Sequence, residues 1–156
     1  MLGELLEAVG GRTELVLDLK GRNRALPGRV LEAIAPLVRR GSPVTICARS
    51  WPLLEPFEGV EGVRRVHSVG SARQLARLRR LVAGRRLEGV SIHERLLDSR
   101  SVRELRELAD VIMTWPVNTP ERAHELAAFG VDGLISDRPG LVGRRLLHGP
   151  APAGAS

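Results

Sequence analysis

The chain alternates short, almost continuously apolar runs with longer segments in which apolar residues recur every three or four positions. The short runs lack a helical period and have the length of strands that are buried on both faces. They occupy residues 15–20, 43–48, 63–69, 87–93, 110–115 and 131–136. Strands that alternate with helical segments indicate parallel β-α-β units. We therefore predict a parallel α/β fold with about six strands, while periodicity leaves open whether the sheet is open or forms a barrel.

The intervening helices are indicated by apolar faces and by residues that start or end helices. Apolar side chains repeat along one face of residues 26–38, and Gly41 follows as a C′ glycine. Gly130 ends the last long helix in the same way. The predicted N-caps are Ser71, Ser101 with Glu104 as its capping-box partner, Thr119 before Pro120, and Asp137 before a last short helix.

The length and composition are those of one folded domain. We expect the domain to span residues 1–148, followed by a disordered tail at 149–156 that is rich in glycine, alanine and proline. No apolar run approaches the roughly 18 residues that span a bilayer, and the first ten residues carry no basic region of a secretory signal. A single cysteine, Cys47, excludes an internal disulfide and a cysteine-cluster metal site. A cytoplasmic location is expected.

The net charge of +6 and the high isoelectric point raise nucleic acid as a possible partner. The arginines are nevertheless spread among 18 acidic residues, and the chain has two tryptophans, two phenylalanines and no tyrosine. It therefore has few aromatic platforms on which single-stranded bases could stack. We predict no nucleic-acid partner. Lys20 is the only lysine among 24 basic residues, at the end of the first strand.

Residues that can do chemistry follow the predicted strands. The chain lacks a glycine-rich nucleotide loop, a G-x-S-x-G elbow and an H-E-x-x-H helix. Parallel α/β folds place their sites at the carboxyl ends of the strands. The polar and aromatic candidates there are Asp18, Lys20, Arg49, Ser50, His67, His93, Glu94, Trp115, Asn118 and Asp137.

One long stretch resembles a known enzyme family. The run VIMTWPVNTPERAHELAAFGVDGLISDRPGLV at 111–142 is similar to the C-terminal motif of glycerophosphodiester phosphodiesterases, where a strand ending W-T-V-N precedes a helix and G-V-D-G-I-I-T-D-x-P. LLEAVGGRTELVLDLKG resembles an earlier strand of the family that ends E-L-K, and CARSWPLL stands in the place of S-S-F-D-P-E-A-L. GVSIHERLL resembles the segment before the tryptophan strand, so the likeness extends from Leu5 to Val142.

The resemblance implies a (β/α)₈ TIM barrel of the phospholipase-C-like phosphodiesterase type. Such enzymes are hydrolases of lipid metabolism that split glycerophosphodiesters with a divalent metal, Mg²⁺ or Ca²⁺. It implies that Asp18 ligates the metal and that Lys20, on the same side of the strand, contacts the phosphate. Trp115 and His93 are the implied substrate-binding residues.

The family's H-R-G strand, E-x-D strand and H-D turn do not occur in these 156 residues, and aspartate stands at position 18 in place of glutamate. Our interpretation is the C-terminal part of a glycerophosphodiester phosphodiesterase-like domain, truncated or inactive as this chain. Two alternatives stay open. One is an active enzyme completed by another chain or by an upstream segment, and the other is a non-catalytic binding or scaffold protein with a relict phosphate site.

Each candidate residue also has a purely structural interpretation. Asp18 and Lys20 can form an in-strand ion pair, Trp115 can be core packing, and His67 with His93 can be ordinary polar residues at strand ends rather than a rebuilt acid–base pair. Six strands of a larger barrel would also leave two unpaired edges, which predicts a homo-oligomer, aggregation, or pairing of the first strand with the last.

Overall fold

The computed structural model describes residues 14–82, 84–138 and 140. The strands in this part of the chain form one parallel sheet in sequence order: β1 (Leu15–Leu19), β2 (Val44–Ala48), β3 (Val63–Val69), β4 (Leu87–His93), β5 (Ala109–Trp115) and β6 (Gly133–Leu134). The helices are α2 (Leu26–Arg39), α3 (Ala72–Leu81), α4 (Ser99–Arg106) and α5 (Pro120–Ala128), with 3₁₀ helices η1 (Trp51–Phe57) and η2 (Glu94–Leu96). The predicted parallel α/β fold with six strands is confirmed.

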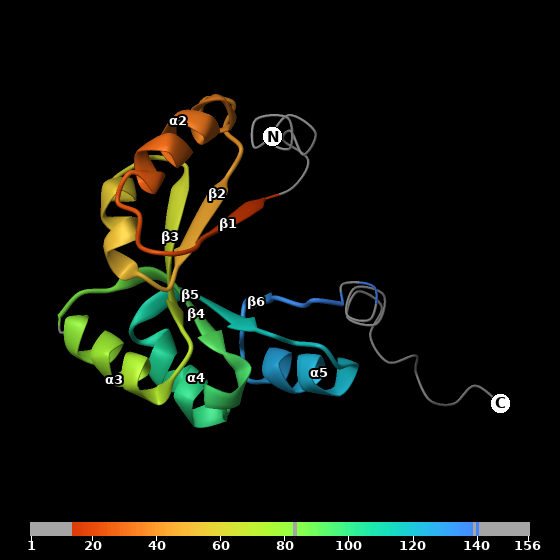
Figure 1. The fold of residues 1–156 in the computed structure, drawn as a ribbon. Helices are drawn as coiled ribbons and strands as arrows, with labels where there is room; N and C mark the ends of the chain where they lie inside the picture. The colour runs from red at the N-terminus through yellow and green to blue at the C-terminus, as the bar shows by residue number, and fades with distance from the viewer. Residues whose placement is uncertain (1–13, 83, 139, 141–156) are drawn as a thin grey trace.

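The sheet curls into part of a barrel, and the helices lie outside it (Figure 1). Helix α2 lies on the side of β1 and β2, while α3, α4 and α5 lie on the side of β4, β5 and β6 (Figure 1). Within the described residues β1 pairs with β2, and β6 pairs with β5. Of the three outcomes expected for the edges, the pairing of the first strand with the last does not occur in the described part, where β1 and β6 are the edge strands.

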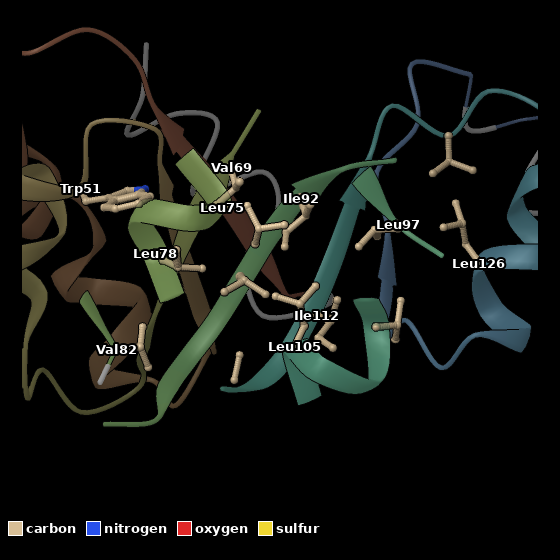
Figure 2. Packing of buried hydrophobic residues seen from close by; sticks show 14 of the residues in the cluster. Trp51, Val69, Leu75, Leu78, Val82, Ile92, Leu97, Leu105, Ile112 and Leu126 are labelled. Carbon is tan, nitrogen blue, oxygen red and sulfur yellow. The ribbon is translucent and has the colours of Figure 1, made fainter. Parts of the chain in front are cut away.

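The helix-facing side of the sheet is apolar and holds two adjoining cores. One core joins α2 and η1 to β1 and β2, through residues such as Ile34, Ile46 and Phe57. The other joins α3, α4 and α5 to β4 and β5, where Ile92 and Ile112 contribute to the packing (Figure 2). In β2 and β4 the inner side is largely buried as well, which explains why these strands are nearly unbroken apolar runs in the sequence.

The inner side of the sheet carries small residues where the strands curl toward one another. Cys47, Ser68, Gly89 and Ser91 are buried there. A Cβ atom added at Gly89 would lie 2.9 Å from Cγ2 of Val66, closer than such atoms pack. Small side chains on this side therefore allow the strong curvature of the sheet.

Most predicted helix ends are confirmed. The hydroxyls of Ser71 and Thr119 each accept a hydrogen bond from the backbone three residues on, at 3.3 Å. Gly41 and Gly130 have positive φ angles of 75° and 93° just beyond their helices. These geometries satisfy backbone groups that the helix itself leaves unpaired.

The predicted cap of α4 was wrong by three residues. The N-cap is Asp98, whose carboxylate accepts the backbone N–H of Ser101 at 2.7 Å, while the Ser101 hydroxyl accepts the N–H of Asp98 at 2.8 Å. Glu104, the predicted capping-box partner, instead binds Arg79 and Arg100. A carboxylate three residues upstream gives Ser101 the N3 role in place of the N-cap role.

The last strand is shorter than the predicted 131–136. The carboxylate of Asp132 accepts the backbone N–H of Ile112 at 2.7 Å, so a side chain takes the place of a ladder bond at the start of β6. Most of the helix predicted after Asp137, and the tail predicted at 149–156, lie outside the described residues. No helix in the described part is long and apolar enough to cross a membrane.

Candidate functional site

The carboxyl ends of β1 and β2 border a cleft of about 500 Å³. Its lining comes from the turn after β1, from the loop that leads from β2 into η1, and from the first two turns of α3. Among the residues that the structure describes, the lining side chains include four cations and no carboxylate: Lys20, Arg22, Arg49 and Arg77, with Leu19, Ser50, Trp51, Pro52 and Gln74. The volume is in the range of small-ligand sites. We call this the cationic cleft.

Lys20 and Asp18 form an ion pair at the edge of the cleft. The Lys20 ammonium nitrogen lies 2.5 Å from a carboxylate oxygen of Asp18, and the two side chains are 79% and 44% exposed. The expected placement of both residues on one side of the strand is therefore observed. Because the pair is solvated, it contributes little to stability, and the ammonium is available to an anion that displaces the carboxylate.

Arg77 is held against the face of Trp51. Its guanidinium carbon lies 4.8 Å from the centroid of the indole ring. Trp51 is 6% exposed, and its Nε1–H donates to the carbonyl oxygen of Ser68 at 3.0 Å. A cation stacked on a fixed indole gains from the cation–π attraction and loses rotational freedom. Arg77 therefore presents its N–H edges in a restricted set of directions.

Arg49 is held in the same way against Trp115, at the end of β5. Its guanidinium carbon lies 5.1 Å from the indole centroid. His93, at the end of β4, packs edge-on against Trp115 with ring centroids 4.9 Å apart. Gly70 lies beside the stack, since a Cβ atom at this position would be in ordinary contact, at 3.5 Å, with both Arg49 and Trp115. Arg49 thus connects the cleft to the two predicted substrate-binding residues.

Asn118 joins the ends of β5 and β6. Its amide nitrogen donates to the Asp137 carboxylate at 3.2 Å, and its amide oxygen accepts the backbone N–H of Asp137 at 3.1 Å. The Ser136 hydroxyl donates to the same oxygen at 3.2 Å. Asn118 therefore links the ends of β5 and β6 and fixes the rim of the sheet beside Trp115.

Cys47 lies beside Asp18 on the inner side of the sheet. The two residues are paired in the β1–β2 register, and the thiol is buried. Burial, together with the negative charge of Asp18, raises the pKa of the Cys47 thiol to about 11. The thiol is therefore protonated near neutral pH and is a poor nucleophile, as expected for a small buried residue.

His67 and His93 do not form an acid–base pair. His67 is aligned with Val90 in the sheet, whereas His93 is three residues further along β4, on the opposite side of the strand. The His67 ring packs edge-on against Trp51, with centroids 5.8 Å apart. His67 does lie near the end of β3, as predicted, but its side chain is on the helix-facing side of the sheet, which leaves the structural interpretation for this residue.

Asp18 remains a prediction as a metal ligand. The described residues contain no group of three or more His, Cys, Asp or Glu side chains placed to hold a metal ion. The Asp18 carboxylate accepts a hydrogen bond from Lys20, and the nearby Cys47 is held in its protonated form. Because Mg²⁺ and Ca²⁺ need several oxygen ligands, the described residues do not by themselves fit either ion.

A second hollow, of about 360 Å³, lies at the amino ends of the strands, and its charged lining is mainly carboxylate. Three carboxylates and one guanidinium line it, from Glu14, Glu88, Asp110 and Arg64. Arg64 and the hydroxyl of Thr45 both donate to the Glu14 carboxylate, at 3.0 and 2.7 Å. Glu88 and Asp110 are in turn paired with Arg65 and Arg86, so the charges around this hollow nearly balance, whereas the cationic cleft has an excess of positive charge.

No sequence pattern pointed directly to Arg77, Gln74 or Arg22 as site residues. Gln74 and Arg77 are three residues apart on α3 and therefore share a helix face, which is the available signal. The 3₁₀ helix η1, which places Trp51 under Arg77, had no recognisable pattern in the sequence. The cleft depends on contacts between β2, η1 and α3 that only the folded chain reveals.

No family model and no curated protein matches the chain. Among solved structures, a protein from Silicibacter pomeroyi assigned as a glycerophosphoryl diester phosphodiesterase matches with a TM-score of 0.74 and 24% identity, over 89% of this chain and 53% of that one. An Oleispira antarctica phosphodiesterase, solved with its product sn-glycerol-3-phosphate, matches with a TM-score of 0.69 and 19% identity, over 87% of this chain and 55% of that one.

A glycerophosphodiester phosphodiesterase from Thermotoga maritima matches with a TM-score of 0.69 and 21% identity, over 88% of this chain and 59% of that one. The chain thus spans little more than half the length of the structures that it matches. These likenesses establish the fold. The chain has part of the barrel fold that these structures share, as the sequence resemblance implied.

Proposed function

We propose that this chain binds a small phosphoester of the glycerophosphodiester class at the carboxyl end of its partial barrel, and does not hydrolyse it unaided. The observation that carries the proposal is the cationic cleft, whose lining, in the described part of the chain, holds four cations and no carboxylate. Cationic donors form short, strong hydrogen bonds with phosphate oxygens. The glycerophosphodiester class is suggested by the fold that the chain shares with the matched structures.

The residues around the cleft have distinct roles in this proposal. Lys20 supplies a point charge to the phosphate, and Arg49 supplies a planar fork of N–H donors. Trp115 and His93 form an aromatic wall beside Arg49, against which the organic part of the ligand packs. The N-terminus of α3 also lies at the cleft, through Gln74 in its first turn, and its dipole favours an anion.

Binding without turnover follows from what the described residues supply. Hydrolysis requires a proton donor for the leaving alcohol and a means of activating water. His93 accepts the backbone N–H of Arg95 through Nδ1 at 3.3 Å, so its neutral ring has the remaining proton on Nε2. That proton can be donated to a phosphate oxygen. The imidazole of His67 does not face it, because His67 lies on the other side of the sheet.

The proposal is tested by isothermal titration of the purified chain with glycerophosphocholine and glycerol 3-phosphate. We expect saturable binding of at least one of the two, weakened about tenfold by Lys20→Met, since a hydrogen bond to a charged group contributes about 1.5–3 kcal/mol. Arg103→Gln is the matched control, because Arg103 is an exposed cation on α4, away from the cleft. Equal heats for wild type and Lys20→Met would contradict the assignment of Lys20.

A second candidate is an enzyme that another polypeptide segment completes. Two observations favour it: β1 and β6 are edge strands in the described part, and the chain covers 53–61% of the first matched structures. The test is to read the coding frame upstream of Met1 for an H-R-G strand and an E-x-D strand, and to co-express any such segment. Metal-dependent turnover that needs both pieces would support this second function.

A further inference from the structure

The charge of the cationic cleft exceeds what a phosphodiester needs. If Asp18 is counted against Lys20, the guanidinium groups of Arg22, Arg49 and Arg77 remain. Within the part of the chain that the structure describes, none of these three is paired with a carboxylate. A phosphodiester carries a single negative charge. A phosphate monoester has a second ionisation with a pKa of about 6, so it carries nearly two charges at neutral pH and has three terminal oxygens.

Two of the three guanidinium groups are oriented before any ligand arrives. Arg49 and Arg77 come from different elements, and each lies on a tryptophan that is itself held in place, Trp115 by His93 and Trp51 by its hydrogen bond to Ser68. Planar forks fixed in this way suit a group whose oxygens point in several directions. A diester presents two such oxygens and a monoester three.

From this excess of fixed charge we infer that the cationic cleft selects doubly charged phosphate monoesters over singly charged phosphodiesters. The inference rests on the proposed function, because it names which phosphoester the same cleft takes. The preferred ligand then belongs to the class of compounds that hydrolysis of a phosphodiester releases. The chain then acts as a receptor for a small phosphate monoester.

The pH dependence of binding separates this inference from general attraction of anions. Lowering the pH from 7.5 to 5 protonates the monoester, with a second pKa of about 6, and removes one of its charges. The titratable groups nearest the cleft are Asp18, His93 and His67. Protonation of any of them adds positive charge to the protein and strengthens the binding of an anion. Affinity that falls as the pH drops must therefore come from the charge of the ligand.

The experiment is titration calorimetry of the full chain at fixed ionic strength, with glycerol 3-phosphate, glycerophosphocholine and inorganic phosphate at pH 7.5 and pH 5. We expect glycerol 3-phosphate to bind about tenfold more tightly than glycerophosphocholine at pH 7.5, as one additional charge-assisted contact would give. This preference should largely disappear at pH 5. Inorganic phosphate should bind more weakly than glycerol 3-phosphate, since it lacks the glycerol that packs beside Trp115.

Arg77→Gln should reduce the preference for the monoester, while Arg80→Gln should leave it intact. Both arginines are exposed residues of α3, but Arg80 does not line the cleft, so the pair matches the charge change and the helix. Arg77→Lys keeps the charge and tests the planar fork, and a thermal melt of each variant verifies folding. The variant series supports the inference only if the loss at Arg77 exceeds the loss at Arg80.

Three results would overturn the inference. Equal affinity for the monoester and the diester would refute the preference and leave the proposed function standing. Binding of inorganic phosphate as tightly as glycerol 3-phosphate would refute the assignment to an ester. Absence of binding by all three ligands would refute both this inference and the proposed function.

Discussion

A guanidinium that lies on an indole ring differs from one in open water, because its faces are covered and its N–H edges are directed outward. Arg77 and Arg49 both have this arrangement, on Trp51 and Trp115, which are the two tryptophans of the chain. The sequence singled out Trp115 and left open whether it packs in the core or contacts a ligand. The structure gives it a third role, as the support of an arginine at the rim of the cleft.

At the same scale, the side chain of His67 should make folding stability depend on pH. Burial, and then the charge of Arg65, lower the pKa of His67 below its usual 6.5. Its Nδ1 atom is buried and has no hydrogen-bond partner among the described residues. As the pH falls below 6.5, the unfolded chain takes up a proton that the folded chain resists, so the free energy of unfolding decreases. The slope is at most about 1.4 kcal/mol per pH unit for one group.

His67→Leu should remove this slope below pH 6.5 and leave stability at pH 8 unchanged or higher, because the unpartnered nitrogen is lost. Urea unfolding at several pH values measures the effect. His124→Leu, at an exposed position of α5, is the control and leaves His67 and its slope in place. A His67→Leu profile parallel to that of the wild type between pH 8 and 5 would contradict this account.

The sequence predicted the positions of single site residues better than their orientations and roles. Asp18, Lys20, His93 and Trp115 were placed correctly at strand ends, because period 2 and the carboxyl-end rule follow from strand geometry alone. Their chemical roles remain predictions. The sequence left the role of His67 open between an acid–base partner and an ordinary polar residue. The structure places its side chain on the helix-facing side of β3, which removes the acid–base pair with His93.

At the scale of elements, the curvature of the sheet depends on the size of the inner side chains. Gly89 occupies the middle of β4, opposite Val66 of β3, and both are fully surrounded. Glycine inside a strand often marks a close approach of neighbouring chain. In this protein the close neighbour is Val66, because a Cβ atom at position 89 would approach its side chain too closely.

Gly89→Ala should therefore destabilise the fold by about 1–3 kcal/mol, the usual cost of an extra methyl group in a packed interior. The matched control is Gly28→Ala in the first turn of α2, where an added Cβ atom meets nothing within 4 Å. That change should be neutral or stabilising by up to about 1 kcal/mol, since alanine is the better helix former. In chemical unfolding, the denaturant concentration at the midpoint should fall for Gly89→Ala. For Gly28→Ala it should rise or stay unchanged.

The strands were predictable because their apolar runs are uninterrupted, and β3 and β4 have the predicted bounds. The failures occurred where two side chains compete for one backbone group. Asp98 takes the cap that Ser101 was expected to form, and Asp132 replaces the first ladder bond of β6. A single sequence shows both competitors, but only the three-dimensional path of the chain decides between them.

At the scale of the whole molecule, the two ends of the partial barrel differ in charge. The carboxyl end carries the cationic cleft, and the amino end carries the hollow lined by Glu14, Glu88 and Asp110. This polarity directs an anion to the same end at which the catalytic sites of parallel β/α barrels lie. The net charge of +6, which first suggested nucleic acid, is accounted for in part by this cleft.

The edge strand β1 should promote self-association. Val16 is 42% exposed on β1, within an edge that is unpaired in the described part of the chain. Sedimentation velocity should show association that grows with concentration, and Val16→Glu should weaken it. Leu81→Glu, at a 57% exposed position of α3 away from this edge, is the control and should have little effect. A monomer at all concentrations, with fast amide exchange in β1 and β6, would contradict the expectation.

Phosphorus NMR of the purified chain tests the central claim, binding without turnover, most directly, because phosphodiester and phosphate monoester signals are distinct. The sample contains glycerophosphocholine and glycerol 3-phosphate with Mg²⁺ or Ca²⁺. We predict that the glycerol 3-phosphate signal shifts or broadens in the presence of the protein, while the diester signal keeps its intensity over many hours. Growth of the monoester at the expense of the diester, dependent on metal and abolished by Asp18→Ala, would contradict the account.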